Sequence, residues 1–404
     1  MSAWPSDTSA QSASSNATRQ TSTPPTIVPL AINGRYLIRR TTGVERVARG
    51  IIDALDARVD EDGLLQCAGI AFRPRMLAPK GEVSAPPRRI PIDRTARLSG
   101  NAWEQCELPW SARGALLLNL CNTAPLLARA QCTYVHDAGV YAIAESYDWR
   151  FRSWYRCLHR FYRRRGDFLL TNSVFSACEL RRHAGFALER LHVARPGCNH
   201  VHGFADTPLP EPLARLVEGR GYYVIVGSRA RHKNIAIAVE AHRRHLRTHP
   251  QAPALVMIGG ERRDIFGHDM DADDSADDGV VHLGYLDDPT LVAILRRARA
   301  LIFPSRYEGF GLPLVEAMAL GCPVVASDLP TTREIGIDAC WTFPPQDADA
   351  LAAQLALVDA HPRQVSQKVA IGRQRAAGFS WDACADAVLD TLAQAALQRK
   401  EKTA

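Results

Sequence analysis

The chain has 404 residues, of which 46% are hydrophobic and 23% charged, and its formal net charge is +6. This length exceeds what one hydrophobic core usually organises, so we expect two domains. The composition is that of a globular protein, and the modest positive charge permits anionic ligands without indicating nucleic acid. Residues 1–26 are rich in Ser, Thr, Ala and Pro and almost lack large apolar side chains, which predicts a disordered tail.

The apolar runs of the chain are strand-length and bounded by polar residues, so none is predicted to cross a membrane. The N-terminus also lacks the basic start and the apolar segment of a signal peptide, which predicts a cytoplasmic protein. Ten cysteines are scattered along the chain without a Cys-x-x-Cys or a paired Cys/His spacing. Reduced, mostly buried thiols are therefore expected, rather than disulfides or a zinc site.

Residues 27–200 alternate between short apolar runs and longer amphipathic stretches. The runs that predict buried strands lie at 27–33, 64–72, 115–121, 132–137 and 167–173, and the stretches that predict helices lie at 44–55, 147–164 and 175–183. This β-α-β alternation predicts a parallel sheet with helices on both faces.

Proline and glycine crowd together near the middle of the chain, which predicts an interdomain linker at 201–220. The alternation then restarts in residues 221–380, and a last helix is expected within 381–404. The predicted strands lie at 222–228, 254–259, 280–284, 300–305 and 322–327, and the predicted helices at 235–246, 289–297, 312–320 and 348–360. Two α/β domains therefore follow each other. Because ligands of open parallel sheets bind beyond the carboxyl ends of the strands, we expect an interdomain cleft.

The most specific segment is FPSRYEGFGLPLVEAMALGCPVVAS, in which a loop after a buried strand carries Glu308. Gly309 and Gly311 let the backbone pass close to a ligand, and the helix N-terminus behind them presents free N–H groups that suit a phosphate. Glu316 is the one carboxylate of an otherwise apolar helix, so it needs a hydrogen-bond donor such as a ribose hydroxyl. The alternative is that Glu308 caps the helix and Glu316 pairs with a nearby arginine.

The spacing Glu308-x₇-Glu316 inside this strand–loop–helix resembles the signature of retaining glycosyltransferases of the GT-B fold, family 4. The resemblance extends over residues 27–397 and implies an α/β protein of two Rossmann-like parallel-sheet domains facing across a cleft. It implies that Glu308 lies beside the donor sugar and that Glu316 holds the nucleotide ribose. The remaining residues of the implied donor loop are Gly309, Phe310, Gly311 and Leu312.

A basic cluster follows the first predicted strand of the second half, where Gly227 and Ser228 lead into Arg229, Arg231, His232 and Lys233. Cations at a strand-to-helix turn suit a diphosphate, although exposed Arg and Lys are more often solvated surface. The placement resembles the phosphate-binding segment of the family, which implies Lys233 and Arg229 as donor ligands. Family members differ in the spacing between this arginine and the lysine.

Two segments of the first half resemble family motifs that face the donor across the cleft. His136 and Asp137 end a predicted strand; a lone histidine there is more often structural, but the pair implies a contact from His136 to a sugar hydroxyl or developing charge. Asp137 would orient the loop. Thr42 and Glu45 have capping-box spacing. In the family, the glycine of this loop, here Gly43, lets the backbone approach the donor diphosphate.

Residues 269–278 are acidic and contain an Asp-x-Asp spacing, which binds manganese in another glycosyltransferase architecture. They follow a polar stretch instead of a buried strand, and they lack the glycine and the final glutamate of a calcium loop. We therefore expect a solvated acidic loop and no metal.

Residues 149–165 interleave arginines with aromatic side chains. Such a helix suits an anionic membrane surface or a lipid diphosphate, nucleic acid would suit it as well, and an ordinary surface helix with inward aromatics explains it equally. Because the rest of the chain resembles a transferase, we expect no nucleic-acid partner and favour a peripheral contact with the inner face of the cytoplasmic membrane.

The resemblance implies transfer of a sugar from a nucleoside diphosphate, with retention and without a metal or cofactor, to a hydroxyl of a glycan or polyprenyl-linked oligosaccharide. The opening NGRYLIRRTTGVERVARGI is similar to mannosyl- or rhamnosyl-transferring members of surface polysaccharide and lipopolysaccharide assembly, which favours GDP-mannose. The alternatives are a nucleotide-sugar 2-epimerase on the same fold and a non-catalytic nucleotide-sugar or lipid-binding protein. A dinucleotide oxidoreductase is disfavoured because no G-x-G-x-x-G opens either half.

Overall fold

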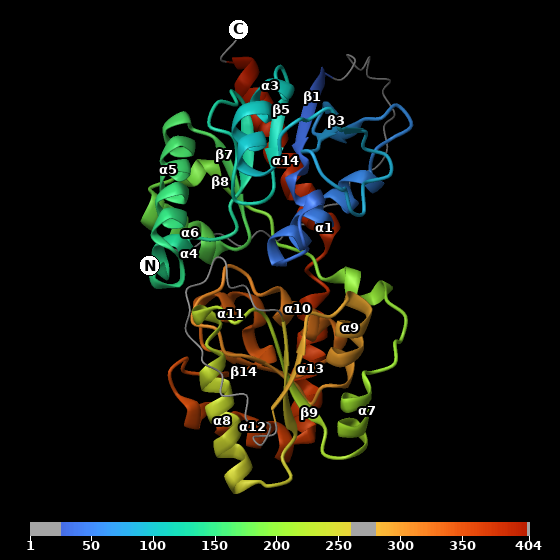
Figure 1. Cartoon of the computed structure of the whole chain (residues 1–404), viewed down its shortest axis with the longest axis vertical. Helices are drawn as coiled ribbons and strands as arrows, with labels where there is room; N and C mark the ends of the chain where they lie inside the picture. The colour runs from blue at the N-terminus through green and yellow to red at the C-terminus, as the bar shows by residue number, and fades with distance from the viewer. Residues whose placement is uncertain (1–25, 260–279, 402–404) are drawn as a thin grey trace, which may run out of the picture.

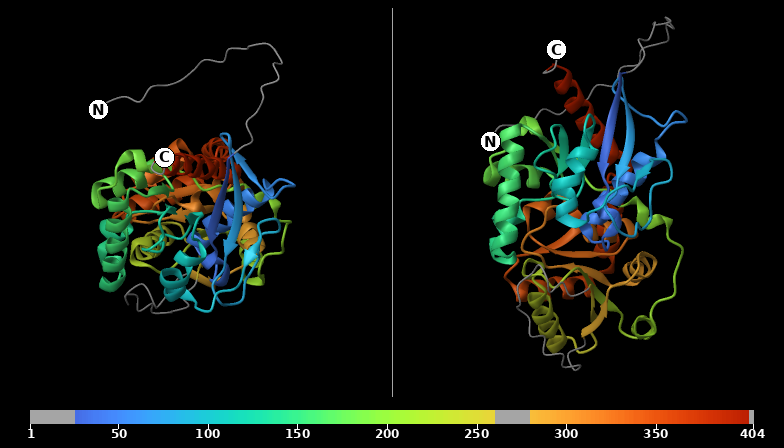
Figure 2. Two further views of the ribbon diagram at one scale, coloured as in Figure 1. Left: turned by 90° about the horizontal axis from the view of Figure 1, so that it is seen from above. Right: turned by 45° about the horizontal axis from the view of Figure 1, so that its top comes forward.

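The computed structural model describes residues 26–259 and 280–401. It has two α/β halves, drawn one above the other in Figure 1, and the last helix returns from the lower half to the upper one (Figures 1 and 2). The tail predicted at 1–26 lies outside the described residues except for Thr26, which begins the first strand. The acidic stretch at 269–278 also lies outside them.

The first sheet has the strand order β2-β3-β1-β5-β6-β7-β8, with β4 beside β3. Its strands are β1 (Thr26–Asn33), β2 (Leu65–Cys67), β3 (Ile70–Leu77), β4 (Ile92–Asp93), β5 (Leu116–Asn119), β6 (Gln131–Tyr134), β7 (Phe168–Thr171) and β8 (Leu191–Val193). All pair in parallel except β2, which is antiparallel to β3. The single strand predicted at 64–72 is therefore wrong. Ala68 and Gly69 have φ of 47° and 75° and turn the chain back on itself as a two-residue hairpin.

Helices connect these strands as the β-α-β pattern predicts. They are α1 (Gly43–Ala57), α2 (Gly100–Ala102), α3 (Leu108–Ser111), α4 (Gly139–Ala142), α5 (Trp149–Arg165) and α6 (Val174–Ala184), with short turns η1 (Gly34–Ile38), η2 (Trp103–Glu107), η3 (Ala144–Ser146) and η4 (Leu188–Arg190). Local chemistry sets the ends of α5: Asp148 accepts a hydrogen bond from the Arg150 N–H, and Gly166 closes the helix at φ 67°.

The second sheet has the order β11-β10-β9-β12-β13-β14, and its strands are all parallel. Its strands are β9 (Tyr222–Val226), β10 (Ala254–Ile258), β11 (Val280–Gly284), β12 (Ala300–Phe303), β13 (Val324–Ser327) and β14 (Cys340–Phe343). Its helices are η6 (Arg231–Lys233), α8 (Ile235–Thr248), α9 (Asp288–Arg297), α10 (Leu312–Leu320), α11 (Pro330–Gly336), η7 (Ile337–Ala339), α12 (Ala348–Ala360) and α13 (Pro362–Ala376).

The segment predicted as a linker at 201–220 is not a plain connection. It contains part of η5 (Asn199–Gly203) and all of α7 (Glu211–Glu218). Pro210 precedes α7 as its N-cap and Gly219 follows it, so the same proline and glycine that predicted a break instead bound a short helix.

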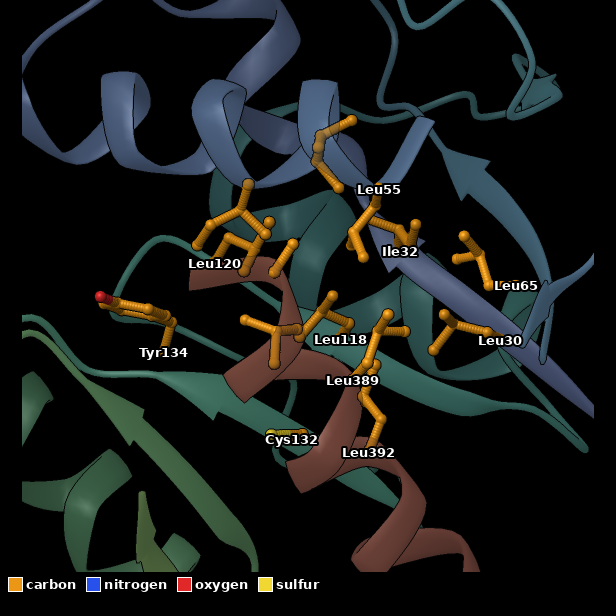
Figure 3. Close-up of a cluster of buried hydrophobic side chains, with 14 of the residues drawn as sticks. Leu30, Ile32, Leu55, Leu65, Leu118, Leu120, Cys132, Tyr134, Leu389 and Leu392 are labelled. Carbon is orange, nitrogen blue, oxygen red and sulfur yellow. The ribbon is translucent and has the colours of Figure 1, made fainter. Parts of the chain in front are cut away.

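The last helix, α14 (Trp381–Glu401), packs into the core of the first half. Figure 3 shows Leu389 and Leu392 of this helix among the side chains of Leu30, Leu118 and other residues of the first sheet. The chain thus crosses between the halves twice, first near residue 200 and again near residue 380. Both halves are therefore anchored to each other by buried apolar side chains as well as by the chain itself.

Each sheet changes the direction of its strand order at one place. In the first sheet this switch lies between β1 and β5, and in the second between β9 and β12. Loops that leave neighbouring strands in opposite directions open a crevice at such a point, where ligands of parallel α/β sheets bind. The segments carrying Gly43, Lys233 and Glu308 all follow strands that flank a switch point.

Candidate active site

The loops after β9 and β12 bring Lys233 and Glu308 together. The Lys233 ammonium donates to Glu308 Oε1 at 2.6 Å, and the Ser305 hydroxyl donates to the same oxygen at 2.6 Å. Both charged side chains are largely buried, with 20% of Lys233 and 13% of Glu308 exposed. The Thr331 hydroxyl donates to the Glu308 carbonyl at 2.6 Å and fixes the backbone of the loop. The two sequence-predicted residues therefore form one ion pair at the switch point.

This pairing sets the charge of the glutamate. Burial raises the pKa of the Glu308 carboxyl, but the Lys233 ammonium, His232 and the hydrogen bonds from Lys233 and Ser305 lower it more, so the net pKa lies below its ordinary value. Glu308 is consequently an anion at neutral pH.

Glu316 lies on α10, the helix that follows the Glu308 loop, and it is 5% exposed. Its Oε1 is 3.3 Å from Nε2 of His200, which belongs to η5. Arg46 of α1 contributes a positive charge from the other half, since its own pKa is raised by Asp288 and Glu316 against the effect of burial. The arginine pairing weighed from the sequence is thus replaced by a histidine contact from the segment between the two halves.

The glycines of the donor loop serve different purposes. Gly311 precedes α10 at φ 98°, in the left-handed region that favours glycine. Gly309 instead lies against the first half, because a Cβ there would be 2.8 Å from the Asp137 Cβ and 2.8 Å from the His136 carbonyl oxygen. The close approach predicted for Gly309 is therefore one of protein to protein.

Phe310 and Leu312 are hydrophobic core residues as well as members of the predicted donor loop. The Phe310 side chain is 4% exposed and meets the Phe379 ring edge-on at 5.5 Å. Leu312 is partly buried and packs against the cores of both halves. The ring of Phe310 is committed to the core, and its place in the donor loop stays a prediction.

The basic cluster divides between two places. Lys233 faces Glu308, whereas Arg229 places its Nη2 3.1 Å from Nδ1 of His282. Arg229 and Gly227 line a separate hollow with Met257 and His282, beyond the ends of β9, β10 and β11. Ser228 lies in the loop after β9.

In the first half, His136 and Asp137 follow β6 and adjoin the Glu308 loop. Burial lowers the pKa of His136 to about 4, so the imidazole is neutral, and its Nε2 lies 3.0 Å from the Leu120 carbonyl oxygen. Asp137 accepts the Gly139 N–H at 2.7 Å. Burial is the largest cause raising the pKa of Asp137, and nearby Glu308 raises it further. The Leu120 carbonyl oxygen contacts Nε2, and the Asn172 side chain also hydrogen-bonds the imidazole.

A hollow opens in front of this pair. It is lined from the first β-α loop and from the aromatic start of α5, by Arg39, Thr42, Val44, Glu45, Cys121, Asn122, Val135, His136, Asp137, Val140, Tyr147, Phe151 and Tyr155. Gly43 stands at its rim, and a Cβ on Gly43 would meet nothing within 4 Å. Glu45 accepts the Thr42 N–H at 3.2 Å, as the capping-box spacing predicts, and pairs with Arg39 at 3.0 Å.

Direct contacts hold the halves together around these residues. The hydroxyls of Ser173 and Ser176 donate to the Gly309 carbonyl at 2.6 and 3.0 Å. The Glu334 carboxylate accepts two backbone N–H groups at the start of α6, at 3.0 and 2.9 Å. On another side of the interface, Arg46 of α1 and Asp288 of α9 form a bidentate pair at 2.8 and 2.5 Å.

Sequence reasoning missed several of these partners. Ser305, Thr331 and His200 each contact a predicted site residue. Thr331 and His200 lie in segments with no distinguishing pattern, and Ser305 lies in the segment of Glu308 but was not singled out. Asn234 is a partial exception, because it directly follows Lys233. It adopts φ 55°, and its amide donates to the carbonyls of Pro304 and Pro345 at 3.0 and 2.8 Å, which joins three loops of the second sheet.

All ten cysteines are free, and five of them are buried, so the expected burial holds for half of the thiols. Within residues 26–259 and 280–401, no three His, Cys, Asp or Glu side chains are grouped to hold a metal ion. No helix in these same ranges is long and apolar enough to cross a membrane.

Two Rossmann-like parallel sheets, one in each half, define the class of this chain as a GT-B fold. In agreement, residues 214–370 match the family model described as glycosyl transferases group 1. The matched segment is less than half of the chain, and over it the chain is similar to the group 1 glycosyl transferases.

Similar proteins extend this picture. The chain is 30% identical over 223 residues to O-antigen chain mannosyltransferase B of Escherichia coli, covering 54% of this chain and 58% of that one. It is 41% identical over 104 residues to MMP alpha-(1->4)-mannosyltransferase of Mycolicibacterium hassiacum, covering 25% of each. The chain thus spans little more than half of the first relative's length. A solved structure of Anabaena Alr3699/HepE with UDP and glucose has the same fold, with a TM-score of 0.66 and 15% identity over 91% of this chain and all of that one.

Proposed function

We propose that the protein is a retaining glycosyltransferase of the family 4 type, which moves a sugar from a nucleoside diphosphate to a hydroxyl of a glycan or a lipid-linked oligosaccharide. The observation that carries the proposal is the Lys233–Glu308 ion pair at the switch point of the second sheet, in a loop whose Gly309 lies against His136 and Asp137 of the first half. A cation and a carboxylate of the second half thus lie in a loop that contacts the segment of the neutral His136 imidazole in the first half.

The donor is proposed to bind along the second half. Lys233 and the N-terminal N–H groups of α10 would neutralise the diphosphate, and Glu316 would accept hydrogen bonds from the ribose hydroxyls. Arg229 lines the hollow with His282, so we propose that it contacts the nucleoside end of the donor rather than the leaving diphosphate.

The chemistry follows from the leaving group. The bond between the anomeric carbon and the diphosphate oxygen breaks, the acceptor oxygen bonds to that carbon, and the acceptor proton passes to the departing phosphate. Lys233 would stabilise the charge that develops on the diphosphate. A double displacement with retention needs a carboxylate nucleophile near the anomeric carbon. Asp137 is committed to the Gly139 N–H. Front-face substitution with Glu308 beside the sugar therefore fits better.

Mannose is the proposed sugar, with rhamnose as the neighbouring choice and GDP-mannose as the donor. The support comes from the two relatives named as mannosyltransferases, of which one acts on an O-antigen chain by its name. The structure related by fold holds UDP and glucose, so the base and the sugar must both be varied in any test.

A panel of nucleotide sugars tests the proposal. A donor at about 100 times its Kd should stabilise the protein by about 2.7 kcal/mol, which a thermal shift detects. With the matching acceptor, the anomeric configuration of the product, read by proton NMR, should equal that of the donor. An inverted product, or no stabilisation by any nucleotide sugar, would contradict the proposal.

Two other functions make different predictions in the same assay. A nucleotide-sugar 2-epimerase would convert its substrate with no acceptor present. A non-catalytic binding protein would show a thermal shift without product, and Glu308→Ala would leave its behaviour unchanged. No metal or cofactor is proposed, and addition of a chelator to the active protein tests that expectation.

We further propose that α5 contacts an anionic membrane surface from the cytoplasmic side. Leu158, His159 and Tyr162 point into the protein, whereas Trp149 and Phe161 are 64% and 42% exposed. The aromatics are therefore not all packed inward. The exposed arginines of the helix are Arg150, Arg156, Arg160, Arg163 and Arg164.

Cosedimentation with vesicles tests this contact. Native protein should bind phosphatidylcholine vesicles that contain phosphatidylglycerol and not those without it. Each basic residue near such a surface contributes about 1 kcal/mol, so reversing Arg156 and Arg160 to Glu should weaken binding by at least about thirtyfold. The control reverses Arg247 and Arg363, two exposed arginines of the other half. Equal loss in both double variants would contradict a contact through α5.

A further inference from the structure

The buried carboxylate of Glu316 has a partner that is not on its own helix. His200, in the segment where the chain first crosses between the halves, places Nε2 3.3 Å from Glu316 Oε1. The Glu316 side chain is 6% exposed and that of His200 is 23% exposed. A buried carboxylate needs hydrogen-bond donors, and α10 supplies only apolar neighbours in sequence. The histidine therefore serves a need that the helix cannot meet.

The contact at the second nitrogen of His200 determines which of the two ring nitrogens carries the hydrogen. The indole Nε1 of Trp381 lies 3.1 Å from His200 Nδ1. An indole N–H can only donate, so Nδ1 must accept and has no hydrogen of its own. The hydrogen of the neutral ring then sits on Nε2, which points at Glu316. Trp381 thus determines the tautomer that lets His200 donate to the carboxylate.

Trp381 is itself held in one position at the second crossing of the chain. A Cβ on Gly50 of α1 would lie 2.4 Å from its ring, and a Cβ on Gly197 would lie 2.2 Å from its backbone nitrogen. The backbone N–H of Trp381 donates to the Asn199 side-chain oxygen at 3.0 Å. Neither glycine could be replaced without moving the tryptophan. The two chain crossings and α1 therefore pack around the indole and hold it in one position.

We propose that His200 is a positioning residue for Glu316, set by Trp381, and that it aims the carboxylate at the ribose hydroxyls of the donor. This inference rests on the proposed function, in which Glu316 holds the ribose. A carboxylate has about four lone-pair directions. The Nε2–H of His200 occupies one of them on Oε1 and limits rotation of the group, which leaves the remaining directions for the two ribose hydroxyls.

A consequence is that the ribose site is tied to both crossings between the halves. Glu316 belongs to the second half, His200 to the first crossing, and Trp381 to the helix that packs in the core of the first half. A shift of one half against the other would move the indole, and with it the imidazole and the carboxylate. Ribose affinity then depends on residues that never touch the donor.

The tautomer is tested first, in the protein without nucleotide. Histidine ¹⁵N NMR of the native protein should show His200 with hydrogen on Nε2 and none on Nδ1. Trp381→Phe keeps an aromatic ring at this position but removes the indole N–H. The variant should give a mixture of the two His200 tautomers. Hydrogen on Nδ1 in the native protein, or an unchanged spectrum in Trp381→Phe, would overturn the proposal that Trp381 sets the tautomer of His200.

Binding tests the positioning role, using GDP, UDP and their 2′-deoxy counterparts. His200→Leu removes the donor at similar volume and should weaken binding of the ribonucleotide about tenfold, as expected for loss of a hydrogen bond to a charged group. It should also abolish the preference of the native protein for ribo- over deoxyribonucleotide. His200→Gln, whose amide can still donate, should restore most of both. In a Glu316→Gln background, His200→Leu should cause little further loss.

The outcomes separate the two proposals. If the native protein binds neither ribonucleotide, the proposed donor is contradicted, while the NMR result on the tautomer stands or falls independently. If the native protein binds a ribonucleotide and His200→Leu retains its ribose preference, the positioning role is overturned. A loss that His200→Gln does not restore would likewise overturn it, because a purely structural histidine would give that result.

Discussion

The Lys233 ammonium and the Glu308 carboxylate lie 2.6 Å apart and join the loops that leave β9 and β12. Each charge lowers the cost of burying the other, and Ser305 adds a hydrogen bond to the same carboxylate oxygen. A diphosphate bound at this turn would draw on the charge of Lys233, which leaves Glu308 more dependent on its other partners. The ion pair therefore links binding of the donor to the electrostatics beside the sugar.

Lys233→Met should lower the free energy of unfolding of the protein by more than substitutions in loop regions usually do. Removing the ammonium leaves a buried carboxylate unpaired, which costs about 3 kcal/mol. Adding Glu308→Gln removes the uncompensated charge, so the double variant should be more stable than Lys233→Met alone. Urea unfolding of the four proteins of this cycle measures the coupling. Losses that simply add would contradict the pairing.

Buried histidines should make the protein less stable in mild acid. Burial lowers the pKa values of His136 and His159 to about 4 in the folded chain, below the 6.5 of an ordinary histidine. The unfolded chain therefore binds more protons between pH 6.5 and 4, so stability is full above pH 6.5 and is lost as the pH falls through that window. Each histidine should cost about 2 kcal/mol between pH 7 and pH 5.

Urea unfolding at pH 7 and pH 5 measures this effect. His159 lies outside the candidate site, with its Nδ1 3.1 Å from the Tyr141 hydroxyl, so His159→Gln removes one titrating ring without touching the donor residues. Its free energy of unfolding should depend less on pH than that of the native protein. Equal pH dependence in the two proteins would show that His159 is not held neutral by burial.

Gly309→Ala should separate the two halves. The added methyl group would meet the Asp137 Cβ and the His136 carbonyl at 2.8 Å, and neither is a flexible side-chain end. We expect a larger radius of gyration by small-angle scattering and at least a tenfold fall in kcat, because a misplacement of about 1 Å can cost a hundredfold. An unchanged radius with full activity would contradict the close contact.

Gly43→Ala is the matched comparison. A Cβ at Gly43 would meet nothing within 4 Å, so the melting temperature should stay close to that of the native protein. If the donor passes near this backbone, as the sequence resemblance implies, the variant should bind the donor more weakly despite its native stability. Native donor affinity would remove Gly43 from the proposed site.

The Arg46–Asp288 pair joins α1 of the first half to α9 of the second, with contacts of 2.8 and 2.5 Å. Asp288→Asn should weaken this contact, and hydrogen exchange at the start of α9 should become faster. Arg333 and Asp328 form a similar bidentate pair within the second half, at 2.6 and 2.6 Å, so Asp328→Asn serves as the control. Faster exchange in both variants would indicate a general loss of stability instead of an effect on the interface.

Much of the fold follows from local pattern. Runs such as residues 116–119 and 324–327 are apolar because both faces of a parallel sheet are covered, and the structure buries every residue of both strands. The hairpin at Ala68 and Gly69 was missed because a continuous apolar run shows no change of direction, and only the backbone conformation reveals it.

The site was predictable only in part. Lys233 and Glu308 could be chosen singly, from a basic turn and a carboxylate in a glycine loop, but their ion pair depends on β9 and β12 being neighbours in the sheet, although Lys233 and Glu308 are 75 residues apart in the sequence. The sequence does not show that the Phe310 ring packs edge-on against Phe379, because these two residues are far apart along the chain. His200 had no local signal, because its partners Glu316 and Trp381 are distant in sequence.

The most direct test of the central claim compares donor binding with sugar transfer in Glu308→Gln. The account expects the variant to bind the nucleotide sugar within about threefold of the native protein, since Lys233 and Glu316 remain, while transfer to the acceptor falls at least about a hundredfold, as for loss of a charge beside the reacting centre. Transfer at the native rate, or loss of donor binding with the rate of bound donor unchanged, would contradict a role for Glu308 at the sugar.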